Sequence, residues 1–189
     1  MIKELLLKNR SYRRFYQENR ISTDDLKSLV ELTRYCASGR NAQTLKYVLI
    51  SEEDKCEEVF KTLSWAGYLS DWTGPKEGER PAAYIIQVND EKLGKNFFCD
   101  DGITAQSILL GAVEKDLGGC ILRAFTKDLA KIIEVPDEMR VVQVIALGKP
   151  KEEVVIDDIK DGDFKYWRDD KDVHHVPKRT IDELIIKEQ

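Results

Sequence analysis

A short basic segment near the N-terminus carries the residues best suited to bind an anion. The segment Asn9–Phe15 holds three arginines and a serine, and it follows the apolar-basic run Met1–Leu7, which can form a helix. In an extended backbone side chains alternate between faces, so Ser11, Arg13 and Phe15 share one face. A hydroxyl beside a planar guanidinium suits a phosphate or another anion. A solvated basic surface loop without a ligand is the alternative interpretation.

Two further segments have residue types that can contact a polar ligand. Asn41 and Gln43 follow a predicted helix and offer side-chain amides, although ordinary turn chemistry would use the same residues. Gly118 and Gly119 follow a long apolar helix that Asp100 opens. Paired glycines permit close approach of the backbone to a ligand, and they also suit the C-cap of a helix.

These segments resemble the nitroreductase family in four places. Asn9–Phe15 resembles the family's R-S-x-R-x-F, and Ala37–Gln43 resembles P-S-x-x-N-x-Q. Asp100–Cys120 resembles D-x-G-x-A-x-Q…G-L-G-x-C, and Ala146–Pro150 resembles G-x-P, with Pro177–Arg179 as the basic segment further on. The four matches occur in the family's order and span nearly the whole chain.

The resemblance implies an FMN cofactor held by basic residues from both ends of the chain. It assigns the phosphate to Arg10, Ser11 and Arg13, together with Lys178 and Arg179. It also places Arg13 close to the N1 and O2 edge of the flavin, where a cation favours the reduced ring.

The resemblance further implies that the polar edges of the flavin contact two other segments. Ser38, Asn41 and Gln43 match the family segment that borders the flavin across a dimer interface. A backbone N–H near Leu122 and Arg123 is expected to reach flavin N5. A homodimer with a shared cofactor site is therefore expected.

The function that the resemblance implies is an FMN-dependent oxidoreductase. NAD(P)H would pass hydride through flavin N5 to a nitroaromatic, quinone or similar acceptor in a ping-pong mechanism. No catalytic side chain is predicted, because the cofactor performs the chemistry. The sequence has no G-x-G-x-x-G after a strand, so no separate Rossmann site is expected. The alternatives are a non-catalytic FMN-binding or sensing module, and a specialised flavin enzyme such as a flavin destructase or dehalogenase.

The chain departs from the family pattern in three places. Asn9 stands where the family often has a first arginine, and Thr44 follows the glutamine where Pro-Trp is usual. The segment between the second predicted helix and the second strand is short. It contains Trp65, Tyr68 and Trp72, which could form a lid over the flavin or pack in the core. These departures weaken any inference about the substrate more than the expectation of a cofactor.

The amino-acid composition limits the domain count and the kinds of partner the chain can have. The 189 residues are predicted to form a single domain, 1–189, with one sizeable core. The 30 basic and 35 acidic residues give a net charge of −5, which argues against nucleic acid as the main partner. No stretch approaches the roughly 20 apolar residues of a membrane span. The N-terminus also lacks a signal-peptide pattern, so the cytoplasm is predicted.

The cysteines and histidines give no sign of a metal site. The four cysteines lack C-x-x-C spacing and are predicted to be buried thiols in a reducing compartment; they are Cys36, Cys56, Cys99 and Cys120. No chemistry is assigned to Cys120. His174 and His175 are adjacent, so they do not face a common point, and a solvated loop is predicted for them.

The order of elements predicts an α+β layered fold. The resemblance further implies a nitroreductase-like three-layer fold with a mixed central sheet flanked by helices. The expected strands are Leu45–Ile50, Ala82–Val88 and Val141–Leu147, and Ser22 and Ser51 are expected to cap two of the helices. Lys149–Pro177 has little regular pattern. The apolar residues after Thr180 are expected to be exchanged with a partner subunit, with packing on their own subunit as the alternative.

Overall fold

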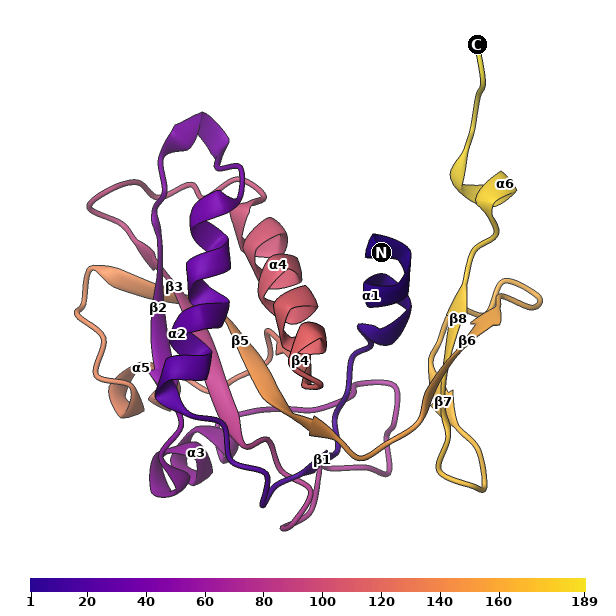
Figure 1. The fold of residues 1–189 in the computed structure, drawn as a ribbon, viewed down its shortest axis with the longest axis horizontal. Helices are drawn as coiled ribbons and strands as arrows, with labels where there is room; N and C mark the ends of the chain where they lie inside the picture. Colours follow the sequence, from indigo (N-terminus) through magenta and orange to yellow (C-terminus); the bar gives the residue numbers. More distant parts are fainter.

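The computed structural model describes residues 1–189, and its centre is a five-stranded antiparallel sheet (Figure 1). The strand order is β1-β5-β3-β2, with β4 also paired to β5. The strands are β1 (Phe15–Tyr16), β2 (Leu45–Ile50), β3 (Ala83–Asp90), β4 (Gly118–Leu122) and β5 (Met139–Pro150). The expectation of a mixed central sheet is wrong, because every neighbouring pair is antiparallel. Ala146 pairs with both Tyr84 and Cys120, so β5 lies between β3 and β4, which run in the same direction but are not neighbours.

Helices cover both faces of this sheet and give the expected three layers. The helices are α2 (Thr23–Glu31) and α4 (Asp100–Glu114) on one face, and α3 (Glu53–Phe60) and α5 (Asp128–Ile132) on the other. Ile85 of β3 packs in a core with α2 and α4, whereas its neighbour Ile86 packs with α3 and α5. This alternation follows from the two-residue period of a strand. None of the helices has the length and apolar character needed to cross a lipid bilayer.

The helix caps follow the sequence prediction at one position and depart from it at another. The Ser22 hydroxyl accepts a hydrogen bond from the backbone N–H of Asp25 at 3.0 Å, which confirms the predicted cap of α2. The predicted Ser51 cap of α3 is wrong. Glu52 is the N-cap residue there, and the Ser51 hydroxyl lies 2.9 Å from the hydroxyl of Thr23 instead.

The paired glycines begin β4, so the alternative that they form the C-cap of the long helix is wrong. Helix α4 ends at Glu114 with Lys115 as its C-cap, and the turn after it has Asp116 in the left-handed region with φ of 55°. Gly119 is needed for close packing, because a Cβ at this position would lie 2.5 Å from the carbonyl oxygen of Ala146. Sequence reasoning missed the strand because glycine rarely occurs inside strands.

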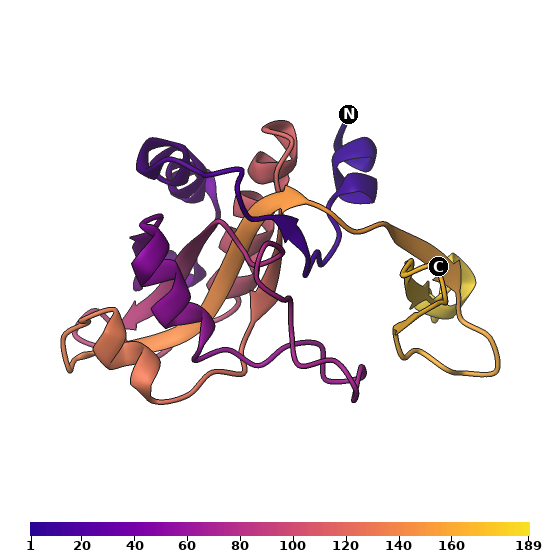
Figure 2. The same ribbon diagram turned by 90° about the horizontal axis from the view of Figure 1, so that it is seen from below.

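A second, three-stranded sheet follows β5 and stands apart from the main body (Figure 2). It consists of β6 (Val154–Asp158), β8 (His174–Lys178) and β7 (Trp167–Arg168) in that order. Strands β6 and β8 are parallel, and β7 is antiparallel to β8. The expectation of little regular structure between Lys149 and Pro177 is therefore wrong. The strands there are short and rich in charge, so the apolar alternation that identifies strands is weak.

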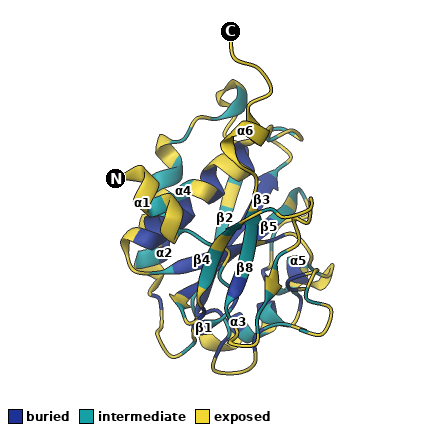
Figure 3. Ribbon diagram, turned by 90° about the vertical axis from the view of Figure 1, so that its right-hand side faces the viewer, coloured by how far each residue is buried: buried dark blue, intermediate teal, exposed yellow.

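A short helix lies near each end of the chain, and both ends are largely exposed. Helix α1 (Ile2–Lys8) lies between α4 and the second sheet, and α6 (Ile181–Leu184) begins a tail that extends away from the body (Figure 1). The tail is coloured as exposed along its length (Figure 3). Ile181 and Leu184 are each 64% exposed and Ile186 is 99% exposed. The alternative that the tail packs on its own subunit is therefore wrong.

Candidate functional site

Four of the predicted phosphate-binding residues line one cavity of about 340 Å³. We call it the basic cavity. Arg10, Ser11, Arg13 and Lys178 contribute to its wall, and no aspartate or glutamate does. The other lining residues are Asn9, Gln106, Leu109, Gly119, Ile121, Tyr166, His174 and Val176. Three cations without a carboxylate make this cavity suited to an anion.

The N-terminal segment is fixed against the central sheet next to this cavity. Ser11 forms a parallel bridge with Gly119, and the Tyr12 N–H donates to the Gly119 carbonyl at 3.1 Å. Phe15 is fully buried, and its ring lies where a side chain at Gly148 would otherwise be. Phe15 and Arg13, which were predicted to share one face of an extended segment, are therefore both buried. Phe15 lies in the core, and Arg13 is only 9% exposed.

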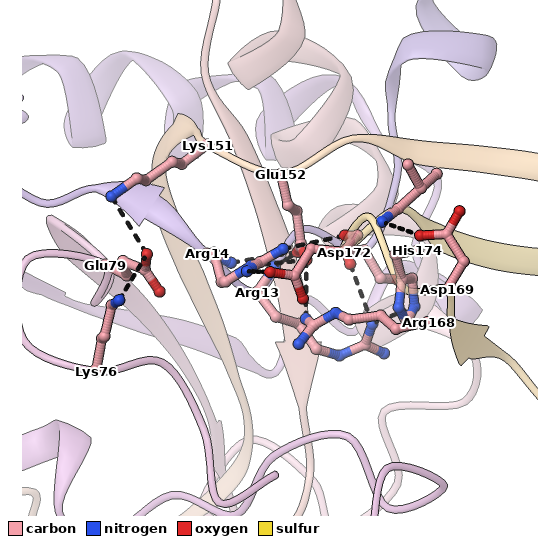
Figure 4. Close-up of polar contacts among 12 residues, drawn as sticks. Arg13, Arg14, Lys76, Glu79, Lys151, Glu152, Arg168, Asp169, Asp172 and His174 are labelled. Atoms are coloured by element: carbon pink, nitrogen blue, oxygen red, sulfur yellow. Dashed lines mark hydrogen bonds and ion pairs between the residues drawn. The ribbon is translucent and has the colours of Figure 1, made fainter.

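The Arg13 side chain is held by several partners (Figure 4). Its Nη1 donates to the Ser11 carbonyl at 3.2 Å and lies 3.1 Å from Nε2 of His174. Its guanidinium lies over the Tyr166 ring, 4.7 Å from the ring centroid. The Nε atom is buried and has no hydrogen-bond partner in the protein. Arg13 is therefore rigidly placed and keeps an unused donor.

Glu152 joins the N-terminal segment to the second sheet (Figure 4). Its carboxylate is fully buried and accepts hydrogen bonds from the backbone N–H groups of Arg13 and Arg14 and from Arg168 Nη2, the last at 2.9 Å. Arg14 also pairs with Asp172 at 3.2 Å. Sequence reasoning missed this carboxylate, because nothing distinguishes it locally from the other charges after β5.

His174 is fully buried on β8, and the prediction of a solvated loop for the two histidines is wrong. Burial, followed by the nearby charges of Arg13, Arg168, His175 and Arg14, lowers the pKa of His174 from 6.5 to about 4. The ring is therefore neutral at physiological pH. Its neighbour His175 stacks on Trp167, with ring centroids 4.1 Å apart.

This lowered pKa predicts a pH-dependent loss of stability. Below pH 6.5 the unfolded chain binds a proton at His174 that the native state takes up only near pH 4. The free energy of unfolding should therefore fall as the pH drops through this window, by up to about 3 kcal/mol from this group. Urea unfolding at pH 7 and pH 4.5 tests this, with His174→Leu as the comparison. An equal loss in the variant would contradict the assignment.

Ser38, Asn41 and Gln43 lie in a different cavity of about 650 Å³, beside η1 (Leu32–Tyr35) and β2. The start of α4 holds their loop in place. Asp100 accepts hydrogen bonds from the Ser38 hydroxyl at 2.6 Å and from the backbone N–H of Gly39 at 2.8 Å, where η2 (Gly39–Asn41) begins. Asn41 and Gln43 are exposed. The two cavities share no residue, so one chain does not bring these amides to the basic cavity.

Three predicted residues lie outside both cavities. Leu122 is buried in the core, and Arg123 contacts Asp101 and donates to Gln143 at 2.9 Å. Arg179 pairs with Glu183 of α6 at 3.2 Å. From β4, the basic cavity is lined by Gly119 and Ile121 instead.

The three aromatic residues considered as a lid have different places. Trp65 is buried in the core beside Phe60, and Trp72 lies beneath the guanidinium of Arg168. Tyr68 is 51% exposed, and its ring centroid lies 4.9 Å from that of Tyr166, which lines the basic cavity. Packing therefore accounts for the tryptophans, and Tyr68 alone adjoins the site.

Comparisons with known proteins agree on the family. The model of the nitroreductase family matches residues 6–149. MhqN of Bacillus subtilis (strain 168), provisionally named an NAD(P)H nitroreductase, is 27% identical over 183 residues, covering 79% of this chain and 88% of MhqN. The crystal structure of a nitroreductase family protein from Streptococcus pneumoniae TIGR4 matches over 100% of both chains, with a TM-score of 0.71 and 17% identity. An FMN-dependent nitroreductase from Clostridium difficile R20291 matches with a TM-score of 0.64 and 20% identity, covering 81% of this chain and 89% of its own. With the family model matching most of its length, the chain belongs to the nitroreductase family of oxidoreductases.

Proposed function

We propose that residues 1–189 form one FMN-binding domain of an NAD(P)H-dependent oxidoreductase whose acceptor is a nitroaromatic, a quinone or a similar molecule. The basic cavity is the observation that carries this proposal. The redox chemistry would come from bound FMN, which takes two electrons from NAD(P)H and gives them to the acceptor in two successive half-reactions. The relatives named for FMN and NAD(P)H support the same assignment.

The residues of the basic cavity fit the cofactor's phosphate. The Nε atoms of Arg10 and Arg13 are buried without a hydrogen-bond partner in the protein, and Lys178 adds a third positive charge to the same wall. A phosphate offers oxygen acceptors for these donors, and charge-assisted hydrogen bonds of this kind are the strong ones. Arg13 would also stabilise negative charge on the bound flavin ring.

The site is completed by a second copy of the chain. Ser38, Asn41 and Gln43 line a separate cavity, so they serve the cofactor of the partner subunit rather than their own. The exposed apolar tail after Thr180 supports a homodimer, because a lone chain leaves those side chains in water. The four free cysteines fit a reducing compartment such as the cytoplasm.

Arg13→Ala tests the assignment of the cavity. The substitution should weaken FMN binding about 10- to 100-fold, since a charge-assisted contact contributes roughly 1.5–3 kcal/mol. Lys178→Ala should weaken it less, because lysine offers a point charge rather than a fork. Flavin-fluorescence titration measures both affinities. Arg140→Ala is the matched control and should leave the affinity unchanged. Arg140 lies at the start of β5, away from the end that pairs with β1, and its side chain pairs with Glu91. Unchanged affinity in Arg13→Ala would remove this residue from the site.

A further inference from the structure

The hydrogen bond between His174 and Arg13 has a defined donor and acceptor. An arginine side chain has only donors, so Nε2 of His174 must accept the hydrogen bond from Arg13 Nη1 across 3.1 Å. The ring proton then lies on Nδ1, which is buried and has no partner. His174 is thus a neutral acceptor in the wall of the basic cavity.

The charges around the ring favour this neutral form. Three arginines lie near the ring: Arg13 and Arg14 from the N-terminal segment, and Arg168 from β7. Glu152 is the one fully buried carboxylate among these groups. A protonated ring would add another positive charge beside these arginines, at a cost that grows with burial. The lowered pKa of His174 agrees with this charge arrangement.

The ring also limits the movement of Arg13 through a shared neighbour. Tyr166 lies under the Arg13 guanidinium, and its ring centroid is 5.2 Å from that of His174. His174 and the Ser11 carbonyl both accept from Nη1, whereas Nε has no partner in the protein. We propose that His174 is a positioning residue, which holds the Arg13 guanidinium so that its free donor faces the anion bound in the basic cavity. The inference rests on the proposed function, because that anion is taken to be FMN.

A double-mutant cycle on FMN affinity tests this role. The proteins are the wild type, His174→Leu, Arg13→Ala and the double variant, each titrated with FMN by fluorescence. His174→Leu should weaken binding about tenfold. If His174 acts through Arg13, the double variant should bind FMN as weakly as Arg13→Ala alone. His174→Gln places an amide oxygen near the position of Nε2 and should restore affinity to within about threefold of the wild type.

The outcomes separate this inference from the proposed function. Losses that multiply in the double variant would overturn the inference, because His174 would then act independently of Arg13. Failure of His174→Gln to restore binding, when its thermal unfolding matches the wild type, would also overturn it. If His174→Leu does not fold, His174→Ala takes its place in the cycle. A wild-type protein that does not bind FMN would overturn the proposed function itself.

Discussion

Replacing Glu152 with glutamine is expected to lower the free energy of unfolding by about 3–5 kcal/mol. The fully buried carboxylate is the shared acceptor for the backbone of Arg13 and Arg14 and for the side chain of Arg168. Glutamine has nearly the same shape but no charge, so the largely buried guanidiniums of Arg14 and Arg168 lose their compensating charge. Urea denaturation of the variant and the wild type measures the difference.

The loss should also affect the basic cavity, because Glu152 connects the N-terminal segment to the second sheet. FMN affinity should fall together with stability in Glu152→Gln. Glu153→Gln is the matched control, since this neighbouring side chain is exposed and should change the unfolding free energy little. A Glu152→Gln protein as stable as the Glu153→Gln protein would show that the buried carboxylate does not hold the two parts together.

Deleting the ten residues Thr180–Gln189 is expected to convert the proposed dimer to monomers and release FMN at the same time. The tail presents four apolar side chains that the single chain leaves largely in water; they are Ile181, Leu184, Ile185 and Ile186. Burial of each on a partner would contribute roughly 1.5–3 kcal/mol, so losing several should separate the subunits. Light scattering gives the mass, and flavin absorbance after gel filtration gives the cofactor content.

A shorter deletion provides the control for this experiment. Removal of Lys187–Gln189 alone takes away polar residues and leaves the four apolar side chains in place, so the dimer and its flavin should persist. A dimer with full flavin content after the longer deletion would contradict the exchanged tail. Another arrangement of subunits would then be needed to bring the cavity around Asn41 of one chain to the basic cavity of its partner.

Local patterns in the sequence predicted the parts of the fold that depend on local interactions. The Ser22 cap and the strand Leu45–Ile50 follow from residue type and periodicity, and the structure confirms both. The basic segment was also recognisable, because Arg10 and Arg13 stand close together in the chain. The structure brings Lys178 to the same cavity, which agrees with the pairing that the family resemblance suggested.

Long-range partners were not predictable in the same way. Glu152 contacts the backbone of Arg13 across 139 positions, and His174 contacts its side chain across 161. Neither partner differs locally from nearby charged and polar residues. The sequence therefore indicated a solvated loop at His174, whereas tertiary packing buries the ring completely.

The visible absorbance of the protein, before and after anaerobic addition of NADH or NADPH, tests the central claim most directly. A protein reconstituted with FMN should retain absorbance bands at about 370 and 450 nm after gel filtration, as bound oxidised flavin does. One of the two nicotinamides should bleach the band at about 450 nm, and a quinone or nitroaromatic added afterwards should restore it. Loss of all flavin on gel filtration would contradict a cofactor site in the basic cavity. Retained flavin that neither nicotinamide bleaches would contradict the proposed oxidoreductase activity and leave an FMN-binding module.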